Sequence, residues 1–307
     1  VLSKAIRPLP DLKTDDEGNV HGAFTDPELR YRQRYVDLVV NPNVKNTFIA
    51  RSAMIRKIRD VFDARGWTEV DTPVLQSIPG GAAARPFVTH HNALNTSLYL
   101  RIANELYLKR LIVGGFEGVY EFSRNFRNEG MDRTHNPEFT VLELYVAYKD
   151  YHWMMETTEN LFGELAQAVH GKMEIPLGEH KVNFAPPYAR VTMRDAILEH
   201  AGVDINDLDE AGLRKACENQ GIETDDSMGR GKLIDELFGT KCEHHYIQPT
   251  FIMDYPSDMS PLTKAHRDKP GYTERFELLV NGTEVANAYS ELNDPLEQRA
   301  RFEDQLK

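Results

Sequence analysis

Charged and hydrogen-bonding side chains gather in the stretch 126–148, between two apolar runs that alternate in hydrophobicity. Side chains two apart in a strand share a face, so Arg127 lies with Glu129, and Glu143 lies with Tyr145. The two runs predict a β-hairpin that presents a cation, two carboxylates and a phenol together. Such a face would suit a charged substrate. A solvated sheet face with ordinary cross-strand ion pairs explains these residue types equally well.

A second hairpin is predicted where Asn281 is followed by Gly282, the strongest short hairpin signal in the chain. A two-residue turn there pairs Leu279 with Glu284 and places Glu277 on the same face, one diagonal step from Glu284. Two carboxylates at that distance repel each other. The pattern predicts a hard cation held by oxygen ligands, unless both side chains point into bulk water.

Three further polar residues of this second hairpin, Asn287, Tyr289 and Glu291, have the opposite strand parity to Glu284. A regular strand would turn them to the other face. If all of them serve one site, a β-bulge must lie near 285–287.

The elements that must position these residues can be read from periodicity and from turn signals. Helices are predicted at 46–66, where Phe48, Ser52, Ile55, Ile58, Val61 and Phe62 form an apolar stripe, at 104–115 with Asn104 as N-cap, at 150–171, and from 294 onward. Strands are predicted at 68–73, 98–102, 118–126, 138–148, 246–256 and 275–292. Residues 1–30 are predicted to be irregular, and residues of about 172–246, which hold a hairpin and short polar helices, an insertion. Hairpins with helices around them predict an α+β fold built on an antiparallel sheet.

Composition bounds the class of protein. The chain has 307 residues, of which 41% are hydrophobic and 27% charged, so it can bury a sizeable core. Its net charge of −12 argues against electrostatic wrapping of nucleic acid, although not against a local contact patch. No apolar run is long enough to cross a bilayer. Two cysteines without metal-ligand spacing indicate a reducing, cytoplasmic location.

Several long strings resemble one known family. "FRNEG" followed by "RTHNPEFT" resembles motif 2 of the class II aminoacyl-tRNA synthetases, and "GWTEVDTPVL", which includes Pro73, resembles motif 1. "GGAAARPFVTHHNAL", "LYLRIANELYLKRLIVGGFEGVYEFSRNFRNEG" and "VANAYSELNDP" are similar to the bacterial lysyl-tRNA synthetases of that class. The resemblance runs from about residue 30 to the end of the chain. It implies an antiparallel sheet of six or seven strands flanked by helices, with a small helical insertion.

The resemblance also implies an activity, in which L-lysine reacts with ATP, pyrophosphate leaves, and lysine passes to the 3′ end of tRNA(Lys). Arg127 would bridge the lysine carboxylate and the α-phosphate, since its planar fork pairs with both anions. The ATP-binding residues implied with it are Glu129, His135, Asn136, Phe139, Glu277 and Glu284, with Glu277 and Glu284 holding Mg²⁺. Orientation and electrostatics would carry catalysis, without a covalent enzyme intermediate.

The lysine pocket implied by the resemblance is acidic. It consists of Gly81, Glu105, Arg127, Glu143, Tyr145, Asn287, Tyr289 and Glu291. Glu291 is the first choice as partner of the ε-ammonium group. A buried ammonium group needs charged partners to offset its desolvation, and a site built for it rejects substrates without one.

The resemblance further implies what surrounds this region. Residues 1–30 would be a linker from an anticodon-binding barrel, and 31–307 a catalytic domain that stops before motif 3, the strand and helix with an ATP-binding arginine. We therefore expect this exact chain to activate lysine weakly or not at all. Family members are homodimers through motif 1, so Ile58, Phe62 and the Pro73 region are expected to face a partner as well as the core.

Two other functions fit the same residues. One is the paralogue that lysylates a translation elongation factor, which also lacks the anticodon domain. The other is a non-catalytic domain that binds lysine or nucleotide for regulation, although such a domain has no need of the pair Glu277 and Glu284.

Overall fold

The computed structural model of this chain describes residues 9–10, 13–14, 20–21, 24–78, 80–82, 84–132, 134–260 and 262–305. The chain divides into two compact units, Val1–Ile58 and Arg59–Lys307. The functional residues predicted above all lie in the second unit. The division falls inside a helix rather than at the predicted boundary between residues 30 and 31.

The first unit has more regular structure than the sequence predicted. Its elements are β1 (Lys13–Thr14) and β2 (Val20–His21), which pair antiparallel, then α1 (Pro27–Arg32), α2 (Arg34–Val40) and the larger part of α3 (Pro42–Asp63). The prediction that residues 1–30 are irregular is therefore wrong at β1, at β2 and at the start of α1. Asp26 explains that start, because its side chain accepts a hydrogen bond from the backbone N–H of Leu29, with Pro27 in the first turn.

The strands of the second unit form an α+β arrangement, as predicted. One sheet has the order β3 (Thr68–Glu69), β7 (Gly118–Phe126), β8 (Glu138–Val146), and another has the order β4 (Leu75–Gln76), β6 (Thr96–Leu100), β5 (Val88–His91). The four-stranded sheet runs β11 (Ala189–Thr192), β12 (Thr250–Pro256), β13 (Tyr272–Val280), β14 (Thr283–Tyr289), and a separate pair joins β9 (Glu174–Leu177) to β10 (His180–Asn183). Most neighbours are antiparallel, but β3 with β7 and β11 with β12 are parallel.

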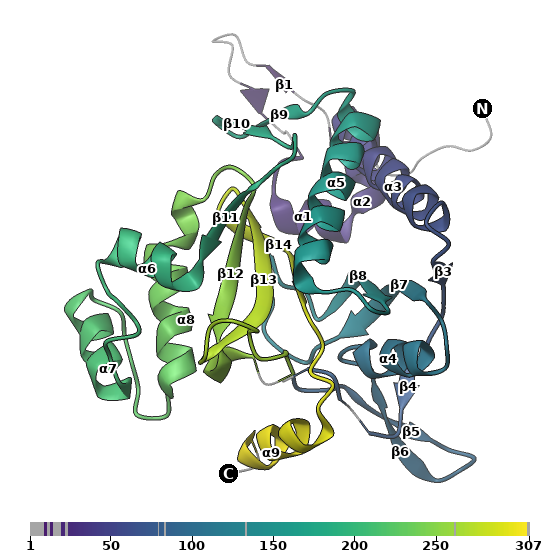
Figure 1. Cartoon of the computed structure of the whole chain (residues 1–307). Helices are drawn as coiled ribbons and strands as arrows, with labels where there is room; N and C mark the ends of the chain where they lie inside the picture. The colour runs from purple at the N-terminus through teal and green to yellow at the C-terminus, as the bar shows by residue number, and fades with distance from the viewer. Residues whose placement is uncertain are drawn as a thin grey trace. The chain divides into compact units, whose positions relative to one another are not determined.

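The remaining helices of this unit flank the strands. They are α4 (Glu105–Val113), α5 (Tyr151–His170), α6 (Met193–Ala201), α7 (Glu210–Asn219), α8 (Arg230–Lys241) and α9 (Pro295–Gln305), with short 3₁₀ turns η1 (Glu243–His245) and η2 (Ser257–Met259). Figure 1 shows α6 and α8 beside the four-stranded sheet, with α7 on the outer side of α8. Within the part of the chain that the structure describes, none of the helices is apolar enough over sufficient length to traverse a bilayer.

Both predicted hairpins are confirmed. Strands β7 and β8 pair in regular register, with Glu121 opposite Glu143 and Asn125 opposite Phe139. The turn between β13 and β14 has positive φ at both Asn281 and Gly282, as a two-residue hairpin turn requires.

The predicted β-bulge in β14 is also confirmed. Leu279 pairs with Glu284, but Leu278 pairs with Ala286, so Val285 is the extra residue. After the bulge the parity of the strand has changed, and Asn287 lies directly opposite Glu277. Glu284 and Asn287 therefore serve the same face.

Both faces of the four-stranded sheet carry a buried apolar cluster. One face packs on α5, where Tyr151 and Met155 join Phe276 and Leu278 in a buried cluster. The other face packs on α6, α7 and α8 through a second cluster that includes Leu279. The helices of the predicted insertion thus complete the core of the sheet. Strand β11 lies inside the predicted range 172–246 and pairs with β12, so this part of the range belongs to the main sheet.

The apolar stripe of α3 is buried only near its C-terminal end. Phe62 is 1% exposed and packs against Trp67 and Tyr120, with ring centroids 5.1 and 4.9 Å away, whereas Phe48 is exposed. Ile58 and Phe62 therefore face the core, as expected, but their burial within the single chain leaves neither side chain accessible to a partner. Pro73 is exposed, as a partner-facing segment would be.

A buried ion pair fixes the start of α4 against β7. Arg101 donates to Glu121 at 2.8 Å and to the carbonyl oxygen of Thr72 at 2.9 Å, and both charged residues are almost wholly buried. Asn104 occupies the N-cap position, as predicted, but its side chain does not cap the helix and donates to Glu121 at 2.8 Å instead. The pair sets where α4, and hence Glu105, begins.

Replacing Glu121 by Gln tests this anchor. We expect a loss of about 3 kcal/mol in the free energy of unfolding, because Arg101 is left buried without a counter-charge. The control is Glu138→Gln, which breaks an exposed pair with Arg124 on the same hairpin and should cost under about 1 kcal/mol. Urea denaturation measures both values, and equal losses would contradict the assigned role.

Candidate functional site

Three carboxylates from separate elements meet in one place, which we call the acidic pocket: Glu105 begins α4, Glu143 lies on β8, and Glu291 follows β14. Tyr289 donates to Glu105 at 2.8 Å, and Tyr145 donates to Glu143 at 3.2 Å. The structure therefore brings together the acids and phenols that the sequence assigned to the lysine pocket.

Lys109 is a member of the acidic pocket that sequence reasoning missed. Its ammonium group lies 2.5 Å from Glu105 and 2.8 Å from Glu291, and its Nζ lies 5.5 Å from the ring centroid of Tyr289. Burial lowers the pKa of Lys109, but Glu291 and Glu105 outweigh burial and raise it. The sequence held one indication of this contact: Lys109 comes four residues after Glu105 on one helix, a spacing at which side chains of opposite charge meet.

Glu143 lacks such a cation. Burial, followed by the nearby charge of Glu105, raises the pKa of Glu143 to about 7, although Tyr145, Lys109 and Arg127 act in the opposite direction. Burial also raises the pKa of Glu291, against the opposing effect of Lys109. The acidic pocket is thus short of positive charge at Glu143, which favours an incoming ammonium group.

Gly81 lies against this pocket through its backbone. Its φ is +89°, and a Cβ atom there would lie 3.2 Å from Cβ of Ala103 and 3.5 Å from Cβ of Glu105. A side chain at this position would be strained and would crowd Glu105. The backbone of Gly81 is therefore beside the acidic pocket, as predicted.

Arg127 continues the site face of β7 beyond the end of the strand, with its backbone N–H donating to the carbonyl oxygen of Pro137. Its guanidinium carbon lies 5.2 Å from the ring centroid of Phe139. Its Nε is buried and has no hydrogen-bond partner among the described residues. A buried donor without a partner is costly, so this atom is suited to an anionic ligand.

The second acidic group lies on β13 and β14. The side-chain amide of Asn287 donates to Glu277 at 3.1 Å and to Glu284 at 3.3 Å, which places it between the two carboxylates. Burial and the charge of Glu284 raise the pKa of Glu277. The predicted pair of acids on one face is confirmed.

Arg275, which the sequence analysis did not single out, partly neutralises this pair. It donates to Glu277 at 2.5 Å, and its guanidinium carbon lies 4.4 Å from the ring centroid of Tyr255. The sequence could have indicated this contact, because Arg275 and Glu277 are two apart on a strand and so share a face.

The donor set at Glu277 and Glu284 fits a magnesium ion. Among the described residues no group of three or more acids, histidines or cysteines is arranged to hold a metal. Magnesium is commonly held by one or two carboxylates together with substrate phosphates, so a pair is sufficient.

The loop between β7 and β8 carries the other predicted ATP-binding residues. Glu129 lines an open cavity of about 500 Å³ together with Ala84, Arg85, Asn128 and Gly130. His135 contacts Asp132 at 2.8 Å and is exposed, and the side chain of Asn136 donates to the carbonyl oxygen of Glu138. The structure does not bring His135 and Asn136 into contact with the acidic pocket, and their predicted contacts with ATP remain untested.

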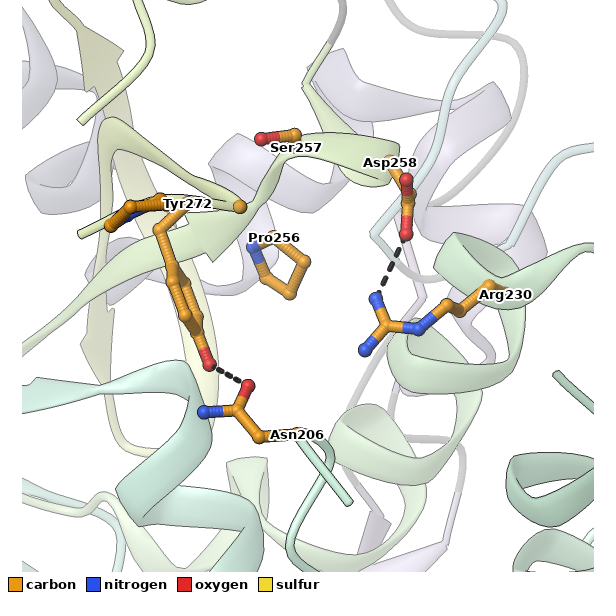
Figure 2. A pocket seen from close by; sticks show the side chains of 8 residues that line it. Asn206, Arg230, Pro256, Ser257, Asp258 and Tyr272 are labelled. Atoms are coloured by element: carbon orange, nitrogen blue, oxygen red, sulfur yellow. Dashed lines mark hydrogen bonds and ion pairs between the residues drawn. The ribbon is translucent and has the colours of Figure 1, made fainter. Parts of the chain in front are cut away.

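A separate polar cavity of about 290 Å³ lies between the α6–α8 region and the loops beside β12 and β13. Figure 2 shows that its side chains satisfy one another: Arg230 pairs with Asp258, and Tyr272 donates to Asn206. None of the predicted site residues lines this cavity.

Comparisons with known proteins agree with this geometry. The family model for class II tRNA synthetases (D, K and N) matches residues 26–307. A protein named "Lysine--tRNA ligase" from Christiangramia forsetii is 66% identical over 307 residues, which are 100% of this chain and 54% of that protein. A protein of the same name from Porphyromonas gingivalis is 66% identical over 306 residues, covering 100% of this chain and 53% of its own length.

A third relative of that name, from Azobacteroides pseudotrichonymphae, is 62% identical over 307 residues, 100% of this chain and 61% of its own length. The chain spans about half the length of most of the curated relatives it matches. The resemblance inferred from the motifs is confirmed, and the chain belongs to the class II tRNA synthetases of the D, K and N group.

Proposed function

We propose that this chain is the catalytic core of an enzyme that activates L-lysine with ATP and then transfers it to tRNA(Lys). The observation that carries the proposal is the acidic pocket beside Arg127. Three carboxylates suit a substrate with two ammonium groups. Aspartate would add a side-chain carboxylate to three others, and asparagine would bring no side-chain ammonium group, so the pocket favours lysine within this family. The names of the relatives support the same choice.

In the proposed complex, Glu291 holds the ε-ammonium group of lysine, while Gly81 and Glu105 lie beside its α-ammonium group. Arg127 pairs with the lysine carboxylate and with the α-phosphate, using donors that include its unpartnered Nε. These contacts hold the carboxylate oxygen close to the α-phosphorus in the orientation needed for reaction.

The first step is then an in-line displacement. A carboxylate oxygen of lysine attacks the α-phosphorus, and the bond to pyrophosphate breaks with the electron pair on the leaving group. Lysyl-adenylate remains, with Arg127 against both parts of the new anhydride. In the second step a hydroxyl oxygen at the 3′ end of tRNA attacks the lysine carbonyl, and AMP leaves.

Glu277 and Glu284 would hold Mg²⁺, which when bound neutralises phosphate charge. Asn287 and Arg275 orient the two carboxylates through the hydrogen bonds described above. Glu129, with His135, Asn136 and Phe139, would contact the nucleotide from the loop and from β8.

Two wider properties belong to the same proposal. Exposed apolar side chains on the first three helices support a homodimer: Tyr31, Tyr35, Val39, Phe48 and Ile49. The free cysteines Cys217 and Cys242, both buried, support a reducing, cytoplasmic location.

Lysine binding should depend on pH through Glu143. With its pKa at about 7 in the free pocket, Glu143 takes up a proton below that pH, and this removes one of the three negative charges that attract the two ammonium groups of lysine. Lysine affinity should therefore fall as pH decreases below about 7, by up to about tenfold per pH unit. The charged and titratable groups that act on Glu143 are Glu105, Lys109, Arg127, Tyr145 and Tyr289.

Calorimetric titration of the chain with lysine between pH 5.5 and 8.5 measures this dependence. Glu143→Gln should flatten it, whereas the exposed Glu138→Gln on the same strand should leave it unchanged. Absence of lysine binding at every pH would contradict the proposed function itself.

Arg127 is tested with a non-hydrolysable lysyl-sulfamoyl adenosine analogue. Arg127→Met should weaken binding of this analogue by about 100-fold, because charge-assisted hydrogen bonds to both halves are lost. Arg127→Lys should recover only part of the loss, since a point charge cannot pair bidentately. Arg124→Met, on the opposite face of β7, is the matched control, and an equal loss there would refute the assignment.

The homodimer is tested by Ile49→Asp on α3, where the side chain is exposed in the single chain. We expect the variant to elute as a monomer in size-exclusion chromatography with light scattering, because a buried unpaired carboxylate opposes association. Arg51→Asp, two positions along and on another side of the helix, should leave the dimer intact. A monomeric parent chain at micromolar concentration would rule out a stable dimer.

A further inference from the structure

Lys109 has no part in the function proposed above, although it contacts two of the three carboxylates of the acidic pocket. Its ammonium group contacts Oε1 of Glu105 and Oε2 of Glu291. These two acids come from different elements, α4 and the end of β14, so Lys109 connects them across the pocket. An exposed i,i+4 pair on a helix would not explain this arrangement, because Glu291 is 182 positions away in the sequence from Lys109.

The contacts leave room for a ligand. Tyr289 and Lys109 both donate to Oε1 of Glu105, while Oε2 of Glu105 has no donor among the described residues and lies on the side of Gly81. The Oε1 atom of Glu291 likewise has no hydrogen-bond donor within the part of the chain that is described. Lys109 therefore engages one oxygen of each carboxylate, and the second oxygen of each remains for another cation.

The charges point to the same arrangement. The acidic pocket holds three carboxylates, whereas lysine brings two ammonium groups. The carboxylate of the substrate lysine pairs with Arg127. One further positive charge is needed to make the filled pocket neutral, and Lys109 is the cation in contact with two of the three acids. Without it, like charges would repel across the pocket, and one of the acids would take up a proton.

We propose that Lys109 is a positioning residue for lysine recognition, a resident counter-ion that joins Glu105 to Glu291, offsets their negative charge and orients both carboxylates for the two ammonium groups of the substrate. The inference rests on the proposed function, because it takes L-lysine as the ligand. Lys109 stays in place when lysine binds, since its contacts leave one oxygen of each acid open.

The test compares Lys109→Met, which removes the charge at similar length, with Lys109→Arg, which keeps it. Lysine affinity and the number of protons released on binding are measured by calorimetry in buffers of different ionisation enthalpy. At pH 7 we expect Lys109→Met to weaken lysine binding by about tenfold, as for a pKa raised by one unit, and to release additional protons. Lys109→Arg should restore most of the affinity. The groups that face Lys109 are Glu105, Glu143, Tyr289 and Glu291.

The pH profile separates this role from a merely structural one. In Lys109→Met the deficit in affinity should shrink between pH 7 and pH 9, because at high pH the acids ionise without help from a resident cation. A packing defect would persist at every pH. The matched control is Lys232→Met on α8, another helical lysine with two carboxylate partners, Asp235 and Glu236, which should leave lysine binding unchanged.

Three results would overturn the inference: unchanged or tighter lysine binding in Lys109→Met at pH 7, a deficit of the same size at all pH values, or no rescue by Lys109→Arg. Tighter binding would mean that Lys109 competes with the substrate for Glu291. Thermal unfolding of each variant shows whether it is folded, and Lys109→Arg keeps the test valid if Lys109→Met is not. If the parent chain does not bind lysine at all, the proposed function fails, which is a distinct outcome.

Discussion

Neutralising buried carboxylates is the constraint on which this site depends. A carboxylate taken out of water must gain a positive charge or hydrogen bonds, or else take up a proton. Glu121 forms an ion pair with Arg101, and Glu277 forms one with Arg275. In the acidic pocket, Glu291 forms an ion pair with Lys109. Every one of these cations comes from the chain itself. The protein thus supplies most of the positive charge that its own carboxylates need. The positive charge that is still missing can come from the ammonium groups of a substrate.

The hairpins that carry the site could be predicted because their signals are local. The turn at Asn281 and Gly282 sets the pairing of Leu279 with Glu284, and the positions of three polar residues then require a bulge. Strand alternation likewise placed Arg127 with Glu129 and Glu143 with Tyr145. In both hairpins the two-residue period of the strand decides the outcome, and in the second hairpin a turn of known length does so as well.

Features that depend on distant partners could not be predicted in this way. Whether Phe62 faces a second chain or the core depends on Trp67 and Tyr120, which arrive from other elements. The pairing of β11 with β12 is parallel and joins segments about 60 residues apart, so no turn signal announces it. Lys109 had a local signal towards Glu105, but only the fold brings Glu291 beside it.

The extra residue in β14 makes the spacing of the last polar residues decide which face of the sheet each one lies on. Since the strand inverts its parity at Val285, the separation between Glu284 and Asn287 determines which side chains face ligand and which face α5. A one-residue insertion or deletion there would exchange core and binding surfaces without altering any side chain's identity. The number of residues between these positions is therefore as important for the binding surface as the residue types themselves.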